Sequence, residues 1–117
     1  MLFVEYPKCS TCRRAKKWLD SHGLDYTDRN IADEKPTYEE LKGWQEKSGL
    51  SLRKFFNTSG QLYRELQLKD RLPSMSGEEM LNLLASDGML VKRPVLVRDD
   101  RVLVGFREEE WEEKLLG

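Results

Sequence analysis

The sequence contains only two cysteines and one histidine, no marked excess of either charge, and no long hydrophobic run. No apolar stretch approaches the ~20 residues that a helix needs to cross a membrane. The net charge is −1, although 35% of the residues are charged, so the chain lacks the basic surface that binds phosphate backbones. We therefore expect no membrane insertion and no direct binding of nucleic acid.

The N-terminal stretch MLFVEYPK has no basic region ahead of its short apolar run and no small-residue cleavage site. It is therefore predicted to form a strand rather than a signal peptide, which makes the cytoplasm the expected location. A length of 117 residues suits one domain, predicted to span 1–117. In a cytosolic chain, two cysteines are more often catalytic or metal-binding than a structural disulfide.

The first third of the chain predicts a β-α-β unit. Residues 2–6 are apolar enough for a buried strand, and a helical pattern follows a short turn at about Ser10. Gly23 is a typical helix stop. Residues 24–31 then alternate between apolar and polar side chains, as a half-buried strand does.

The middle of the chain is predicted to be helical. Two capping boxes, Thr37 with Glu40 and Ser76 with Glu79, each start a helix. The remaining elements are predicted from apolar spacing and turn residues: short helices at 52–56 and 62–68, a hairpin of strands at 95–98 and 102–104, and a final amphipathic helix at 108–116.

This order, β-α-β, a helical insertion at about 36–90, and β-β-α, describes a thioredoxin-like α/β fold with a mixed sheet. A right-handed crossover makes the first two strands parallel, and the late hairpin extends the sheet in the antiparallel direction. In such a sheet, the carboxyl end of the first strand and the N-terminus of the first helix form a natural site.

Cys9 and Cys12 lie at that predicted site, separated by two residues. A zinc site normally takes four ligands, but the only histidine, His22, is about three turns further along the same helix. We therefore predict no metal site. A second alternative is a pair of inert core thiols, because free cysteine is often buried.

A redox pair has the stronger physical argument. Unpaired N–H groups and the helix dipole stabilise a thiolate at a helix N-terminus, and Cys-x-x-Cys thiols can have pKa values lowered to roughly 3.5–7.5. Lys8, Arg13 and Arg14 add positive charge nearby. Cys9 is then the exposed nucleophile, and Cys12, one turn into the helix, is placed to resolve a mixed disulfide.

Arg93 and Pro94 precede the first strand of the late hairpin. Proline cannot donate to a sheet ladder, so it marks a strand start, an edge or a break. The guanidinium of Arg93 could be an ordinary solvated charge or could bind an anion near the helix N-terminus. The residues alone leave these alternatives open.

Cys9-Ser-Thr-Cys12-Arg13 after a strand, together with Arg93-Pro94 before a late strand, resembles the ArsC family of thioredoxin-fold proteins. The resemblance extends over essentially the whole chain, including the segment LVKRPVLV. It implies that Cys9 is the catalytic cysteine, that Arg93 binds an oxyanion, and that the Arg93–Pro94 bond is cis. The candidate substrate- or anion-binding residues are Lys8, Ser10, Thr11, Arg13, Arg93 and Pro94.

The chain departs from the pattern of the family's arsenate reductases at three points. Those enzymes usually lack a second cysteine, which this chain has as Cys12. Their two other anion-binding arginines correspond to positions near Asn57-Thr58 and near Gly105-Phe106 of this chain. Arg107 matches the second of these positions only approximately. The resemblance therefore implies weak arsenate binding.

Two functions follow from the resemblance. The first is a thiol-disulfide oxidoreductase without a tightly bound cofactor, which uses glutathione as a co-substrate and a glutaredoxin or thioredoxin system as partner. The second is a redox-sensing regulator like Spx, which binds the RNA polymerase α subunit and shares the Cys-x-x-Cys pair. The chain ends at Gly117, without the longer tail expected of Spx, and the segment at 55–70 favours the reductase-like branch.

Overall fold

The computed structural model describes all 117 residues. Its centre is a four-stranded sheet in the order β2-β1-β3-β4. β1 (Leu2–Glu5) runs parallel to β2 (Thr27–Asn30) and antiparallel to β3 (Val95–Val97), which pairs with β4 (Val102–Val104). The parallel β-α-β unit, the antiparallel hairpin and the mixed sheet are thus confirmed.

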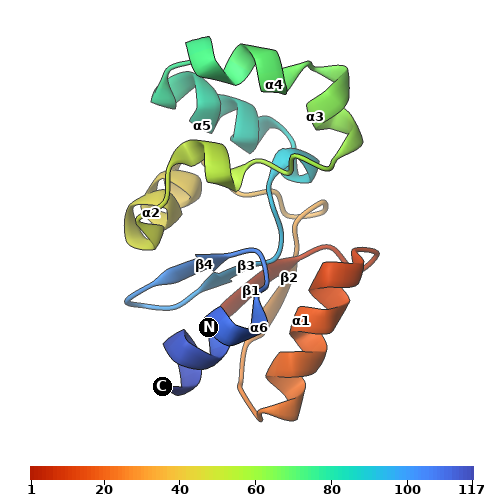
Figure 1. The fold of residues 1–117 in the computed structure, drawn as a ribbon, viewed down its shortest axis with the longest axis vertical. Coiled ribbons are helices and arrows are strands. Elements are labelled where there is room, and N and C mark those ends of the chain that lie inside the picture. The colour runs from red at the N-terminus through yellow and green to blue at the C-terminus, as the bar shows by residue number, and fades with distance from the viewer.

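Helices lie on both sides of this sheet (Figure 1). α1 (Ser10–Ser21) and α6 (Glu108–Trp111) cover one face. The other side carries the insert, whose helix α2 packs against both α5 and β4. The insert consists of α2 (Tyr38–Ser48), η1 (Leu52–Phe55), α3 (Gln61–Glu65), α4 (Leu68–Arg71), η2 (Leu72–Ser74), α5 (Gly77–Ser86) and η3 (Gly88–Leu90).

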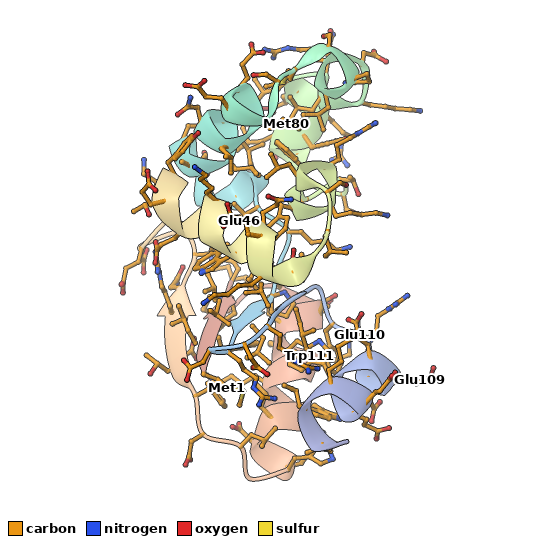
Figure 2. The ribbon with its side chains drawn as sticks, turned by 90° about the vertical axis from the view of Figure 1, so that its left-hand side faces the viewer. Met1, Glu46, Met80, Glu109, Glu110 and Trp111 are labelled. Carbon is orange, nitrogen blue, oxygen red and sulfur yellow. The ribbon has the colours of Figure 1, made fainter.

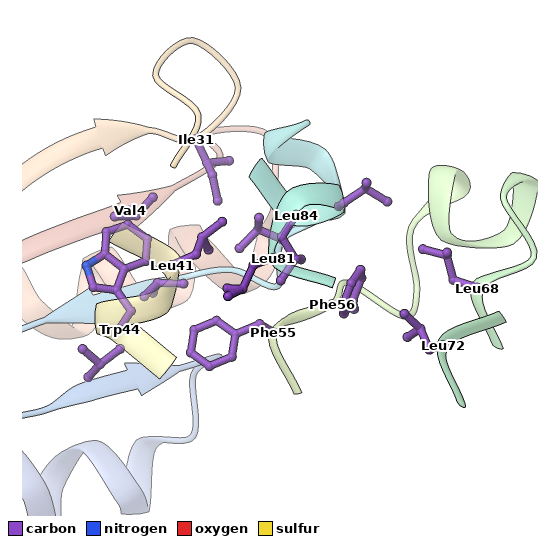
Figure 3. Close-up of a cluster of buried hydrophobic side chains, with 14 residues drawn as sticks. Val4, Ile31, Leu41, Trp44, Phe55, Phe56, Leu68, Leu72, Leu81 and Leu84 are labelled. Carbon is purple, nitrogen blue, oxygen red and sulfur yellow. The ribbon is translucent and has the colours of Figure 1, made fainter. Parts of the chain in front are cut away.

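The alternation of side chains along each strand creates two cores. Phe3, Leu96 and Leu103 point to the α1 side, where they meet Trp18 and Trp111; Figure 2 shows Trp111 directed from α6 into the body of the protein. Their strand neighbours point to the insert side and join the larger cluster of Figure 3: Val4, Val95 and Val102 with Leu41, Trp44, Phe55, Leu81 and Leu84. The central strands β1 and β3 therefore have buried side chains on both faces of the sheet.

Both capping boxes form as predicted. Thr37 accepts a hydrogen bond from the backbone N–H of Glu40 at 3.1 Å, and Ser76 accepts one from Glu79 at 3.1 Å. Gly49 ends α2 in the left-handed conformation with φ 70°, which glycine adopts without steric cost. These local signals fix the two longest helices of the insert.

The structure differs from the predicted elements at several places. The strand predicted at 24–31 is limited to Thr27–Asn30, because the backbone N–H of Leu24 bonds to Leu19 at the end of α1 instead of joining the sheet. The helix predicted at 62–68 is broken at Gln67, whose φ of 53° separates α3 from α4. The final helix spans the predicted 108–116, but after Trp111 it changes into a wider π-helical segment, Glu112–Leu116.

A short antiparallel bridge ties the segment that follows η1 to the segment leading into β3. Phe56 pairs with Val91, the N–H of Asn57 donates to Leu90 O at 2.8 Å, and the N–H of Lys92 donates to Phe55 O at 2.7 Å. The bridge brings residues 54–57 beside residues 92–93. None of the helices combines the length and apolar character needed to traverse a bilayer.

Candidate functional site

Cys9 occupies the N-cap of α1, directly after the turn that follows β1. Its backbone is extended (φ −87°, ψ 123°), and its N–H donates to Tyr6 O at 2.9 Å while its carbonyl accepts from the N–H of Arg13 at 3.0 Å. The side chain is half-buried, and its thiol is free rather than part of a disulfide. The turn thus presents the Cys9 sulfur at the end of the helix where backbone N–H groups are free.

Cys12 lies one turn further along and faces the interior. It is fully buried, on the same side of α1 as Ala15 and Leu19. The pattern of one partly exposed and one buried thiol is therefore the predicted one. The groups that act on the pKa of its thiol include Cys9 and Glu5.

Burial disfavours the thiolate of Cys9, but its hydrogen-bonding environment outweighs burial and lowers its pKa below the ordinary 9.0. The stabilising groups are the backbone N–H and thiol of Cys12, the backbone N–H of Thr11, and the charge of Arg93. These hydrogen bonds act at the helix N-terminus, where backbone N–H groups carry partial positive charge.

The thiol of Cys12 is affected in the opposite direction. Burial is the main factor that raises its pKa, to about 12; Cys9 and Glu5 act in the same direction, and the backbone of Tyr6 opposes the shift. At neutral pH the pair therefore consists of an activated Cys9 and a protonated Cys12. Two thiols whose environments move their pKa values apart are suited to different chemical roles.

Arg93 supplies the fixed positive charge of the site. Its guanidinium carbon lies 5.2 Å from the centroid of the Tyr6 ring, and its Nη1 donates to Met89 O at 3.3 Å. Its Nε is buried and has no hydrogen-bond partner. The Arg93–Pro94 peptide bond is cis, as the family resemblance implied. Arg93 is thus held beside Cys9 with donor capacity unused.

Cys9 opens onto a pocket of about 630 Å³ between α1, the part of the insert around η1 and the β4–α6 connection. One carboxylate, Glu110, lines the pocket, and five cationic side chains do so: Arg14, Lys54, Lys92, Arg93 and Arg107. Asn57, Ser59 and Thr11 add neutral polar groups. The surroundings of Cys9 therefore favour an anionic ligand.

The predicted site residues divide into two groups. Thr11 and Arg93 line the pocket with Cys9, whereas Lys8, Ser10 and Arg13 do not. The guanidinium of Arg13 turns back to Pro7 O at 3.4 Å. Pro94 is buried behind the pocket, where its carbonyl accepts the N–H of Gly105 at 2.8 Å.

Lys54 and Lys92 are pocket residues that sequence reasoning missed. They are far apart in the chain and converge only through the bridge between Phe56 and Val91. Each of them lies within a few residues of that bridge in the sequence, but only the structure reveals the bridge itself. Arg14 was noted only as nearby charge, yet it lines the pocket and donates to Thr11 Oγ1 at 3.3 Å.

His22 lies at the opposite end of α1 from the cysteines. Its ring packs on Trp18 with centroids 4.2 Å apart, and its Nδ1 is 2.8 Å from Trp18 O. No group of three or more histidine, cysteine, aspartate or glutamate side chains is arranged to hold a metal ion.

A thioredoxin-like sheet with a Cys-x-x-Cys pair at the start of its first helix defines a thioredoxin-fold thiol protein. Residues 4–114 match the ArsC family, and the chain belongs to that family. The arrangement of its sheet, its insert and its cysteine pair agrees with this assignment.

Named relatives include an uncharacterized protein and transcriptional regulators. The chain is 57% identical to the uncharacterized protein YusI of Bacillus subtilis, over 97% of this chain and 96% of that protein. It is 30% identical to the global transcriptional regulator Spx of Staphylococcus epidermidis, over 89% and 78% of the two chains.

Solved structures share the fold closely. The crystal structure of an ArsC family related protein from Bacteroides fragilis is 56% identical, with a TM-score of 0.94, and the alignment covers 96% of this chain and 94% of that one. An arsenate reductase from Vibrio cholerae is 27% identical, with a TM-score of 0.79, and the alignment covers 99% of this chain and 96% of that one.

Proposed function

We propose that this protein is a thiol-disulfide reductase that acts on disulfides of an anionic low-molecular-weight thiol of the glutathione class. The observation that supports this most is the pairing of an activated Cys9, open to a cationic pocket, with a buried and protonated Cys12 behind it. Cys9 is the nucleophile and Cys12 the resolving thiol.

In the first step, the Cys9 thiolate attacks one sulfur of the disulfide RS–SR. The Cys9–SR bond forms as the S–S bond of the substrate breaks, and RS⁻ leaves. In the second step, Cys12 gives up its proton and attacks the Cys9 sulfur, which releases the second RS⁻ and leaves a Cys9–Cys12 disulfide. The substrate gains two electrons, and a glutaredoxin or thioredoxin system would return two electrons to the protein.

The size and charge of the pocket support an organic anion over a compact one. Its volume of about 630 Å³ lies in the range of small-molecule sites, roughly 300–1,000 Å³. Its cations come from separate elements, so they can contact carboxylates at different points of one ligand. Glutathione, a thiol with two carboxylates, has this chemistry, and no tightly bound cofactor is required.

This proposal is tested with the Cys12→Ser variant, which can form but not resolve an adduct on Cys9. Glutathione disulfide and the uncharged hydroxyethyl disulfide are compared by mass spectrometry of the protein over time. We expect glutathione disulfide to react faster, with an advantage that shrinks as salt screens the cationic pocket. No adduct, or equal slow reaction with both disulfides, would refute the proposed substrate class.

Arsenate is expected to be reduced weakly or not at all. By the family resemblance, Asn57 and Gly105 mark positions where arsenate reductases carry arginines. Gly105 has φ 77° and lies against Lys92, so a long side chain is disfavoured there. Arg107 is a poor substitute, because its side chain is 81% exposed and pairs with Glu110 at 3.8 Å.

Each lost charged hydrogen bond is worth roughly 1.5–3 kcal/mol, so two missing arginines lower arsenate affinity by on the order of 10²–10⁴. A glutaredoxin-coupled assay over a wide range of arsenate concentrations measures this. Robust turnover at micromolar arsenate would show that Lys54, Lys92 or Arg107 replaces them.

Changing Arg93→Lys is expected to slow adduct formation with glutathione disulfide by roughly 10- to 100-fold, the value of about one charged hydrogen bond. Lysine keeps the charge but loses the planar fork that contacts both Met89 O and a ligand carboxylate. Arg13→Lys is the matched control, because Arg13 lies outside the pocket. Equal rates for both variants would remove Arg93 from the binding site.

A regulatory function is the second candidate, favoured by the similarity to the regulator Spx over 89% of this chain. In that case the Cys9–Cys12 disulfide changes the affinity for a protein partner, for which the family resemblance suggests the RNA polymerase α subunit. Co-purification of reduced and oxidised protein with the α subunit, beside the disulfide assay above, separates the two functions.

A further inference from the structure

Glu5 is the only charged side chain in the buried core, with 4% of its surface exposed. It ends β1, and in the alternation of that strand it shares the face of Phe3, which α1 covers. Burying an ionised carboxylate without a cationic partner is costly. A hydrophobic residue would serve the core better, so the position calls for a chemical explanation.

The groups around Glu5 come from the two elements packed beside it. On β2, Asp28 is paired with Phe3 and so faces the same side of the sheet. On α1, Lys16 binds Asp28 with Nζ 2.7 Å from Oδ2, and the buried Cys12 lies close enough for Glu5 to disfavour its thiolate. Glu5 therefore lies between a buried thiol and a partly exposed ion pair.

Burial is the main factor that raises the pKa of Glu5, to about 7; the hydrogen bond and charge of Asp28 act in the same direction, and Lys16 opposes them. Glu5 thus exchanges protons near neutral pH, which an ordinary glutamate does not do. An acid-base group with a pKa near the working pH is the most effective proton acceptor.

We propose that Glu5 accepts the proton of Cys12 as Cys12 resolves the mixed disulfide on Cys9, and that Asp28 carries this proton on to solvent. The inference rests on the two-step thiol chemistry of the proposed function. The ionised carboxylate of Glu5 removes the proton from Cys12 Sγ, the Cys12–Cys9 bond forms, the Cys9–SR bond breaks, and RS⁻ leaves. The products are the Cys9–Cys12 disulfide, protonated Glu5 and RS⁻.

Such an acceptor meets a specific need of this site. Cys12 is fully buried, so it is shielded from water as a base, and at neutral pH its thiol is almost wholly protonated. Asp28 and Lys16 have side chains 35% and 45% exposed, and they provide the connection from Glu5 to the surface. Cys9, already activated at the helix N-terminus, needs no such acceptor.

The test uses dithiobis-nitrobenzoate, an aromatic disulfide that releases a coloured thiolate in each step. The first release reports attack by Cys9 and the second reports resolution by Cys12, so the assay does not depend on the natural substrate. Cys12→Ser should give one equivalent only. In the wild type, the second rate should rise with pH through about 7 and then level off.

For Glu5→Gln we expect a first release within about twofold of wild type and a second release at least about tenfold slower, without levelling off near neutral pH. Asp28→Asn keeps Glu5 but removes the charge that raises its pKa, so the pH at which the second rate levels off should fall. A purely structural role for Glu5 would not move this pH dependence.

The inference is overturned if Glu5→Gln resolves at the wild-type rate with the wild-type pH profile. If Glu5→Gln does not fold, an unshifted profile in Asp28→Asn overturns it instead. Failure of the glutathione preference in the separate adduct assay would refute the substrate class while the dithiobis-nitrobenzoate result still decides the role of Glu5.

Discussion

Replacing Cys9 with serine is expected to abolish disulfide reduction, with a loss of at least about 10³-fold in turnover. The hydroxyl of serine stays protonated where the thiol of Cys9 ionises, so neither the helix N-terminus nor Arg93 can activate it. Turnover of glutathione disulfide by a coupled assay measures the loss.

Cys12→Ser is the matched control for this experiment. It removes the other thiol of the pair but leaves the nucleophile, so the first step should continue and the mixed disulfide on Cys9 should accumulate. Retained activity in Cys9→Ser together with loss of the first step in Cys12→Ser would reverse the assigned roles.

Changing Phe55→Ala is expected to lower the free energy of unfolding by about 3–5 kcal/mol, because it leaves a cavity in the larger core. Phe55 is fully buried among side chains from the insert and the sheet (Figure 3). A domain of ordinary stability has about 5–15 kcal/mol in total, so this single change removes a large part of it. Urea denaturation measures the loss.

The same substitution should also weaken ligand binding in the pocket. Phe55 is next to Lys54 in the chain, and the carbonyl of Phe55 accepts the N–H of Lys92. Leu116→Ala is the matched control, because Leu116 is 48% exposed and lies outside the pocket, and surface changes are usually within about 0.5 kcal/mol. A loss below 1 kcal/mol in Phe55→Ala would show that the insert does not depend on this core for its position.

Local patterns predicted the elements of this protein well because their causes are local. The capping boxes at Thr37 and Ser76, the stop at Gly49 and the alternation in the β3–β4 hairpin all act within a few residues. The break at Gln67 has no comparable signal, since glutamine is a good helix former and the left-handed backbone there follows from how α3 and α4 pack.

The site was only partly predictable for the same reason. The positions of Cys9 and Cys12 follow from the first strand and helix, so their different exposure could be anticipated. The convergence of Lys54, Lys92 and Arg107 on Cys9 depends on the insert folding back over the sheet. The burial of Glu5 depends on α1 covering the end of β1, which charge counts in the sequence do not reveal.

The central claim is that Cys9 is an activated thiolate and Cys12 a shielded, protonated thiol. Alkylation of the native protein with iodoacetamide across a range of pH, followed by peptide mapping, tests this most directly. We predict that Cys9 is modified with an apparent pKa below the ordinary 9.0 and that Cys12 remains unmodified while Cys9 reacts. Slow and equal modification of both cysteines would contradict the account.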